Sequence, residues 1–308
     1  MGAQRMVKAA LIRHLLSLAI ALLLLWWLTH SDMVGVALKQ LTTLPASLLL
    51  TLLVSQSLSY LCRAGRLFSQ LQARVPLGIS GYMRLVLLHN LSINVIPFRA
   101  GELFLPAALK RYGLSVQEAI ATLFWLRIQD ALVLAALAIA LWPAIPMPLR
   151  IMAGIGMLVA IYLGHAYLPS WRPGNPRLAR LLEKIRPVID ASPVSWSWCI
   201  ANWCSKLLGL SIVLAALGGF ALSGGAAGAL GGELSALLPI QGVAGFGTYE
   251  AGVAFLVNLA EGQGRQALAS AFALHCLTLS LAILAGTLAW IFLPGHKQSS
   301  SPHPESPS

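Results

Sequence analysis

Charge is scarce in this chain of 308 residues, of which only 10% are charged while 57% are hydrophobic. The mean hydropathy is +0.77. A soluble domain carries roughly 25% charged residues to keep its surface in water. This composition therefore excludes an ordinary soluble enzyme or binding domain. It predicts an all-α polytopic membrane protein, because helices satisfy their own backbone hydrogen bonds in lipid.

The sequence also lacks the usual signatures of metal and nucleotide binding. Its four cysteines lie inside apolar runs, without Cys-x-x-Cys or Cys/His ligand spacing. It contains no Gly-x-x-x-x-Gly-Lys phosphate loop and no His/Asp cluster with ligand spacing. We therefore expect no metal and no cofactor.

Hydropathy predicts six full transmembrane spans, near 11–29, 44–62, 117–142, 150–168, 197–222 and 267–293. Each is close to the roughly 20 residues that cross a bilayer. A secretory signal peptide is the alternative for the first run, because basic residues precede it. That run ends at Trp26-Trp27 without a small-residue cleavage site, which favours a retained span.

Two further apolar segments, 81–109 and 233–260, contain Pro and Gly at their centres. Two complete crossings need about 40 residues, so neither segment is long enough for a pair of spans. Non-helical backbone at membrane depth survives only beside protein or a water-filled cavity. We predict two re-entrant helical hairpins, whose turns are formed by Pro97 and Gly101 and by Pro239, Gly245 and Gly247.

The distribution of Lys and Arg predicts the topology. With a cytoplasmic N-terminus, 14 of these residues fall on the inner side and three on the outer side, as the positive-inside rule requires. Both termini are then cytoplasmic, and the protein is expected in the cell inner (plasma) membrane. The order span, hairpin, span occurs twice with opposite orientation, which predicts an inverted repeat of the kind found in secondary transporters.

A single transmembrane domain is expected over residues 1–295, followed by a disordered polar tail at 296–308. Its cytoplasmic loop 169–195 contains a basic amphipathic stretch, 177–186, with apolar residues at i, i+3, i+4 and i+7. This stretch is expected to lie on anionic lipids of the inner leaflet. The inner-face bias accounts for the formal net charge of +11, so nucleic-acid binding does not follow.

Ionisable residues inside the apolar segments are the candidate site. Arg127 and Asp130 are spaced i, i+3 and share a helix face, so a self-neutralising structural pair is one interpretation. The functional interpretation is a cationic pocket in which Arg99 and Arg127 bind an anionic headgroup and Glu102 and Asp130 hold them. The planar guanidinium suits phosphate because it donates two parallel hydrogen bonds.

Two more polar positions are candidates for substrate binding. Glu250 follows Gly245-Phe-Gly247 and would begin a half-helix, where a carboxylate is favoured by the helix dipole. It would contact the arginines or a cationic headgroup. Asn94 lies on the polar approach to Pro97, although a packing amide is the alternative.

The pattern Asn94…Pro97-Phe-Arg99-Ala-Gly101-Glu102, then Arg127 and Asp130, resembles a flippase-like membrane protein family. That family is allied to the lysylphosphatidylglycerol synthase transmembrane region and includes hopanoid-associated proteins. The second run, Pro239…Gly245-Phe-Gly247-Thr-Tyr-Glu250, continues the resemblance, which spans most of residues 10–293 in order and spacing.

The resemblance implies movement of a lipid between leaflets, with an anionic phospholipid or a polyprenyl or hopanoid-type lipid as partner. The chain lacks the acyltransferase-like domain of the bifunctional relatives, so a lysyl-lipid synthase is not expected. A non-catalytic membrane partner of a glycolipid or hopanoid pathway is one alternative function. An intramembrane lipid-modifying enzyme is another, and a homo-oligomer remains an open alternative for the assembly.

Overall fold

The computed structural model describes residues 33–96, 100–142, 145–167, 170, 172, 174–188, 193–238 and 242–293. Within these ranges every regular element is a helix, which confirms the expectation of a helical membrane protein. The predicted first span at 11–29 and the tail at 296–308 lie outside the described residues.

Four described helices are long and apolar enough to cross a membrane, namely α3 (Ala46–Leu71), α6 (Val116–Leu141), α9 (Pro193–Gly218) and α12 (Gly264–Phe292). They match four predicted spans, with two differences in their ends. Helix α3 continues past residue 62, because Leu67 and Leu71 extend its buried face. Helix α9 ends before Gly219, whose φ of 66° is left-handed and stops the helix.

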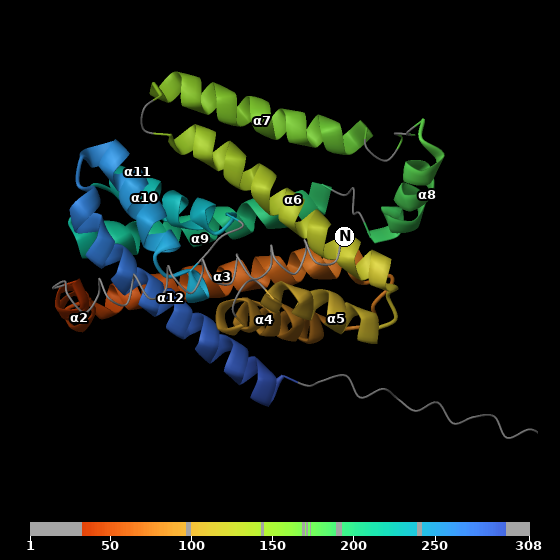
Figure 1. The fold of residues 1–308 in the computed structure, drawn as a ribbon, viewed down its shortest axis with the longest axis horizontal. Helices are drawn as coiled ribbons and strands as arrows, with labels where there is room; N and C mark the ends of the chain where they lie inside the picture. The colour runs from red at the N-terminus through yellow and green to blue at the C-terminus, as the bar shows by residue number, and fades with distance from the viewer. Residues whose placement is uncertain are drawn as a thin grey trace, which may run out of the picture.

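The remaining helices are shorter or only partly apolar. They are α2 (Met33–Thr42), α4 (Ile79–Val95), α5 (Phe104–Arg111), α7 (Met147–Tyr167), α8 (Pro176–Ile185), α10 (Leu222–Ser235) and α11 (Thr248–Glu261), with 3-10 turns η1 (Ala100–Leu103), η3 (Arg186–Val188) and η4 (Val243–Gly245). Helix α7 covers the predicted span at 150–168 and packs on α6 at the outside of the bundle (Figure 1). Its apolar part is shorter, at Met147–Ala160.

Both Pro/Gly segments interrupt a helix where the sequence predicted a turn. In the first, α4 is followed by η1 and α5; in the second, α10 is followed by η4 and α11. The second pair begins at Leu222, so the predicted start at 233 is wrong. Glu233 lies in the last turn of α10, because the glycine-rich stretch before it forms a helix packed against α11.

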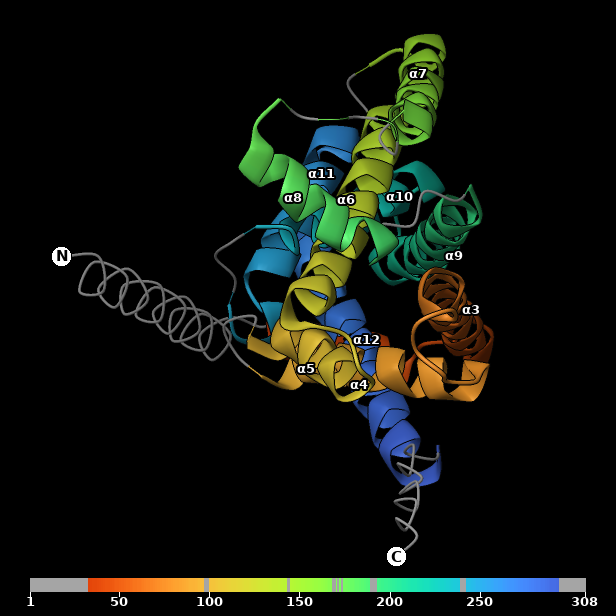
Figure 2. The same cartoon turned by 90° about the vertical axis from the view of Figure 1, so that its right-hand side faces the viewer.

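The long helices form the frame into which the two interrupted pairs are inserted. Helix α3 packs along α9, α4 packs on α12, and α10 packs on α11 (Figures 1 and 2). One hydrophobic core joins α9, α10, α11 and α12 with residues of α3 and α6, and a second joins α3, α4, α5 and α6. The basic helix α8 contacts the bundle through α6.

Candidate functional site

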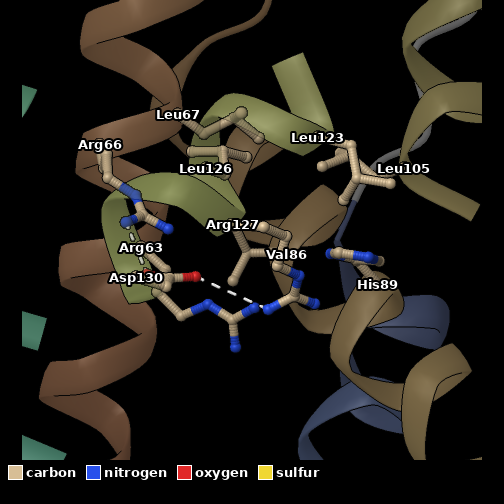
Figure 3. A pocket seen from close by; sticks show the side chains of 10 residues that line it. All are labelled: Arg63, Arg66, Leu67, Val86, His89, Leu105, Leu123, Leu126, Arg127 and Asp130. Atoms are coloured by element: carbon tan, nitrogen blue, oxygen red, sulfur yellow. Dashed lines mark hydrogen bonds and ion pairs between the residues drawn. The ribbon is translucent and has the colours of Figure 1, made fainter. Parts of the chain in front are cut away.

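A small pocket, partly open to solvent, lies between α3, α4, α5 and α6. Its lining combines three arginines, one histidine and one carboxylate with five aliphatic side chains: Arg63, Arg66, Leu67, Val86, His89, Leu105, Leu123, Leu126, Arg127 and Asp130. Figure 3 shows Leu67, Leu126, Leu123 and Leu105 along one side of the pocket. Dashed lines there join the carboxylate of Asp130 to Arg66 and Arg127. Polar groups from three helices, α3, α4 and α6, therefore converge on one space, and α5 adds an aliphatic residue.

Asp130 is the buried anion of the pocket. Arg66 donates a hydrogen bond from its Nη1 to Oδ1 of Asp130 at 2.8 Å, and the two side chains are 3% and 6% exposed. The indole Nε1 of Trp203 donates to the same oxygen at 3.1 Å. A buried carboxylate is tolerated only when paired and hydrogen-bonded. Arg66 and Trp203 together meet this requirement.

Arg127 holds Glu102 through a forked contact. Its Nη2 lies 2.6 Å and 2.7 Å from the two oxygens of Glu102, and its Nε lies 3.2 Å from Oε2. The other terminal nitrogen, Nη1, is 3.6 Å from Oδ2 of Asp130. Arg127 therefore links the η1 turn of the first break to the middle of α6. Its side chain remains 35% exposed, unlike that of Arg66.

Arg63 differs from its two neighbours because no carboxylate lies within salt-bridge distance of it among the described residues. Its Nη1 donates to Oδ1 of Asn90 at 3.3 Å, and Asn90 in turn donates to the hydroxyl of Tyr60. The described part of the pocket thus contains three guanidinium groups against the carboxylates of Asp130 and Glu102. This arrangement leaves an excess of one positive charge.

The second break has a different chemistry. Oε1 of Glu250 lies 2.8 Å from Nδ1 of His275, and its Oε2 accepts a hydrogen bond from the backbone N–H of Gly247 at 2.6 Å. Glu250 thus caps the first turn of α11, as the sequence suggested for a carboxylate there. Its described side-chain partner is His275, and no contact with Arg127 is found among the described residues. The expected contact with Arg99 falls on residues outside that part of the chain.

The predicted turn glycines are required by the backbone. A Cβ on Gly101 would overlap the carbonyl group of Ser92, whose hydroxyl donates to the Gly101 carbonyl at 2.9 Å. Gly245 and Gly247 have φ values of 85° and 84°, which L side chains rarely adopt. Pro97 and Pro239, the other predicted turn residues, lie outside the described residues.

A family model described as the lysylphosphatidylglycerol synthase TM region matches residues 14–286. The chain belongs to this family. The match includes both interrupted helix pairs and the whole arginine–carboxylate cluster, and it confirms the resemblance noted in the sequence. Family membership identifies a membrane protein of lipid metabolism or transport. Searches of curated proteins and of solved structures give no match.

In this member of the lysylphosphatidylglycerol synthase TM region family, the structure brings together three of the predicted site residues, Glu102, Arg127 and Asp130. Asn94 does not line the pocket; its side chain donates to the carbonyl oxygen of Asn90 at 2.7 Å within α4. Arg99 lies outside the described residues.

Sequence reasoning missed Arg63, Arg66 and His89 as members of the pocket. The two arginines were counted as cytoplasmic flanking charges because the predicted span ended at residue 62. The signal was present in the apolar residues Leu67 and Leu71, which continue the helical stripe through this basic stretch. Arginines inside a buried stripe face the bundle interior, where they mark a functional site.

Proposed function

We propose that this protein is a transporter that moves a lipid or lipid-linked intermediate between the leaflets of the inner membrane, and that it is not an enzyme. The headgroup phosphate binds in the α3–α4–α5–α6 pocket, where Arg63 and Arg127 reach it. The observation that carries the proposal is the excess of guanidinium groups over carboxylates in a pocket built inside an apolar bundle.

The charges of the pocket divide into satisfied pairs and one unmatched cation. Asp130 is neutralised by Arg66, and both are almost fully buried. Glu102 takes up most of the hydrogen-bonding capacity of Arg127. Arg63 is left with a neutral amide as its described partner. A cation at membrane depth is costly, so an anionic ligand beside Arg63 would be strongly favoured.

The aliphatic wall supports binding of a lipid rather than a freely dissolved ion. Five of the ten lining residues are Leu or Val, and they exclude water from one side of the pocket. Attraction between a phosphate and a guanidinium increases as the local dielectric constant falls. A headgroup would therefore gain both charge neutralisation by arginine and contact between its glycerol or prenyl stem and this wall.

The two interrupted helix pairs support a transport cycle. Helices α4, α5, α10 and α11 have 17, 8, 14 and 14 residues, all fewer than the roughly 20 needed to span a bilayer. We propose that both pairs are re-entrant hairpins. Together with α3, α6, α7, α9, α12 and the segment at 11–29 they give six full spans and two hairpins.

The packing pattern supports an inverted repeat that relates α3, α4, α5 and α6 to α9, α10, α11 and α12. Each contact in the first half has its counterpart in the second: α3 with α4 and α9 with α10, α4 with α5 and α10 with α11, α5 with α6 and α11 with α12. One pair of cross-contacts corresponds as well, because α4 packs on α12 and α10 packs on α6. Repeats of this kind alternate access between the two sides of a membrane.

The orientation follows from the basic residues. We propose that α8 and the Lys110–Arg111 end of α5 face the cytoplasm, where α8 rests on anionic lipids. The first hairpin then opens to the cytoplasm and the second to the outside.

The test is a reconstitution of the full chain in liposomes that contain leaflet-reporter lipids. The panel contains phosphatidylglycerol, phosphatidylcholine and a polyprenyl phosphate. Wild-type protein should equilibrate an anionic lipid between leaflets, and Arg63→Gln should slow this at least about tenfold, as expected for loss of about 1.5–3 kcal/mol from a charged hydrogen bond. Arg127→Lys should also slow transport, because lysine loses the forked geometry.

Arg111→Gln is the matched control, since this arginine is exposed at the end of α5. It should move lipid at the wild-type rate. Wild-type rates in Arg63→Gln would overturn the headgroup site. Absence of any lipid movement by well-folded wild-type protein would reject the transporter and favour the non-catalytic pathway partner.

A further inference from the structure

His275 of α12 lies between two hydrogen-bond acceptors. Its Nδ1 is 2.8 Å from Oε1 of Glu250, and its Nε2 is 3.1 Å from the carbonyl oxygen of Ala244. The imidazole is 9% exposed and the carboxyl 2% exposed. Both contacts are thus within hydrogen-bonding distance and protected from water.

These contacts require one more proton than a neutral imidazole and an ionised carboxylate provide. A neutral imidazole has one N–H, and it can donate to only one of its two partners. A carbonyl oxygen never donates. Both contacts become hydrogen bonds only if His275 carries protons on both nitrogens, or if Glu250 is protonated and donates to Nδ1. Either way, the pair holds one exchangeable proton.

The surroundings of the pair are aromatic rather than charged. The rings of Phe246 and Tyr249 lie 4.4 Å and 4.6 Å from that of His275, centroid to centroid. Besides the pair itself, the titratable groups on α12 and on the helices packed against it are Lys39, Tyr82, Arg84, His89, Cys199, Cys204, Lys206, Tyr249, Glu261, Arg265 and Cys276. Among the described residues, none of these forms a hydrogen bond or ion pair with His275. Glu233, on α10, is occupied by Lys206 at 2.7 Å.

We propose that Glu250 and His275 form a proton-binding site that couples proton movement to lipid movement. This proposal rests on the transport function proposed above and names its coupling ion. The site is built into the second break, because Glu250 caps α11 and Ala244 belongs to η4.

Proton release would free the η4 turn. When one proton leaves to water, the neutral imidazole keeps its Nδ1–H bonded to the Glu250 carboxylate. Nε2 then presents a lone pair to the Ala244 carbonyl oxygen, and that hydrogen bond is lost. Ala244 has a φ of 52° and a ψ of 20°, a conformation that persists only while its surroundings hold it.

The η4 turn also contacts α4, the helix that leads into the first break and contributes His89 to the arginine pocket. A conformational change in η4 is therefore transmitted to the arginine pocket through α4. This path provides a physical link between proton occupancy in one half of the molecule and headgroup binding in the other.

The first measurement follows the protonation state of His275. The full chain, with ring-¹⁵N histidine, is placed in lipid nanodiscs, and the ring-nitrogen shifts are followed from about pH 5 to pH 8; His275→Gln identifies the signal. The wild-type signal should change as one proton leaves the pair. In Glu250→Gln the side-chain amide donates to Nδ1 permanently, so His275 should stay neutral throughout. A neutral His275 in the wild type over the whole range would overturn the site.

The second measurement tests, in liposomes, whether a pH gradient changes the distribution of lipid between the leaflets. One coupled proton and a gradient of one pH unit should shift the steady-state leaflet ratio of an anionic lipid by up to about tenfold. With Glu250→Gln the leaflet ratio should not respond to the gradient, and with Ser280→Ala, at an exposed position of α12, it should respond as in the wild type. If Glu250→Gln does not fold, His275→Gln takes its place.

The outcomes separate the two proposals. If wild-type protein equilibrates the lipid but the leaflet ratio does not respond to the gradient, coupling is overturned and the transport function stands. No lipid movement by folded wild-type protein would overturn the transport function, and coupling with it, while the nitrogen shifts would still report whether the pair binds a proton.

Discussion

Each interrupted helix pair consists of two helices and a 3-10 turn between them, but the two pairs differ in the chemistry of their interiors. At the first break, arginines and carboxylates surround open space, and Arg127 and Asp130 meet within it. At the second, one Glu–His pair lies under aromatic rings, and glycines bring α10 and α11 close together. The first is suited to bind a charged group, whereas the second is closed by packing.

Glycine explains how the second pair becomes so compact. A Cβ on Gly252 would overlap the carbonyl oxygen of Gly231, and one on Gly232 would overlap the ring of Tyr249. Small residues allow membrane helices to approach this closely, and van der Waals contact then holds them together. In the first pair the comparable close approach is at the turn itself, where Gly101 meets the Ser92 carbonyl.

The largest expected effect comes from breaking the buried pair at the first break. Asp130→Leu alone leaves the Arg66 charge without its anion, and removing one partner of a buried pair typically costs about 3–5 kcal/mol. The thermal stability of the detergent-solubilised protein, followed by size-exclusion chromatography, should fall sharply. The double variant Arg66→Leu with Asp130→Leu should recover most of the loss.

The matched exchange in the second pair is Glu233→Gln, which breaks the contact with Lys206; the side chain of Lys206 is 26% exposed and that of Glu233 is 10% exposed. It should cost less than Asp130→Leu, because the charge left on Lys206 still reaches solvent, whereas that of Arg66, which is 3% exposed, does not. Equal losses for Asp130→Leu and Glu233→Gln, or no recovery in the double variant, would show that the first break is not organised around a buried charge pair.

Much of this fold could be predicted from the sequence because lipid leaves few alternatives. Apolar runs of span length at 44–62, 117–142, 197–222 and 267–293 correspond to α3, α6, α9 and α12, since only helices satisfy their backbone in a bilayer. The breaks were predictable from Pro and Gly. The start of α10 was not, because a glycine-rich stretch has low helix propensity and forms a helix here through its contact with α11.

The site was predictable only as far as spacing along one helix allows. Arg127 and Asp130 share a face at i, i+3, and their interaction was foreseen. Their other partners come from different helices. Arg66 lies 64 residues from Asp130 in the sequence, and His275 lies 25 residues from Glu250. Such pairings depend on tertiary packing, which no local pattern specifies.

An intermediate effect is expected from filling the space that glycine leaves in the second pair. Gly252→Ala places a methyl group against the Gly231 carbonyl and should destabilise the protein by about 1–3 kcal/mol, the usual cost of overpacking. Gly156→Ala in α7 is the control, because nothing lies within 4 Å of its Cβ position. It should stabilise by roughly 0.5–1 kcal/mol, since alanine favours a helix. If Gly252→Ala leaves the stability unchanged, α10 and α11 separate readily and the second pair is not closed by packing.

The smallest effect, and the one that most directly probes the strained turn, is expected from Ala244→Gly. The left-handed conformation of Ala244 costs an L residue roughly 1–2 kcal/mol, and glycine adopts it freely. Glycine also has more conformational entropy in the unfolded chain, which lowers the free energy of unfolding by about 0.5–1 kcal/mol. The net increase in stability should therefore be about 1 kcal/mol or less. Ala236→Gly is the control, because its φ of −67° is right-handed and glycine there should only destabilise. Melting curves of the two variants should therefore move in opposite directions. A loss of stability in both would show that Ala244 is unstrained, and η4 would then store no energy for release when the proton leaves His275.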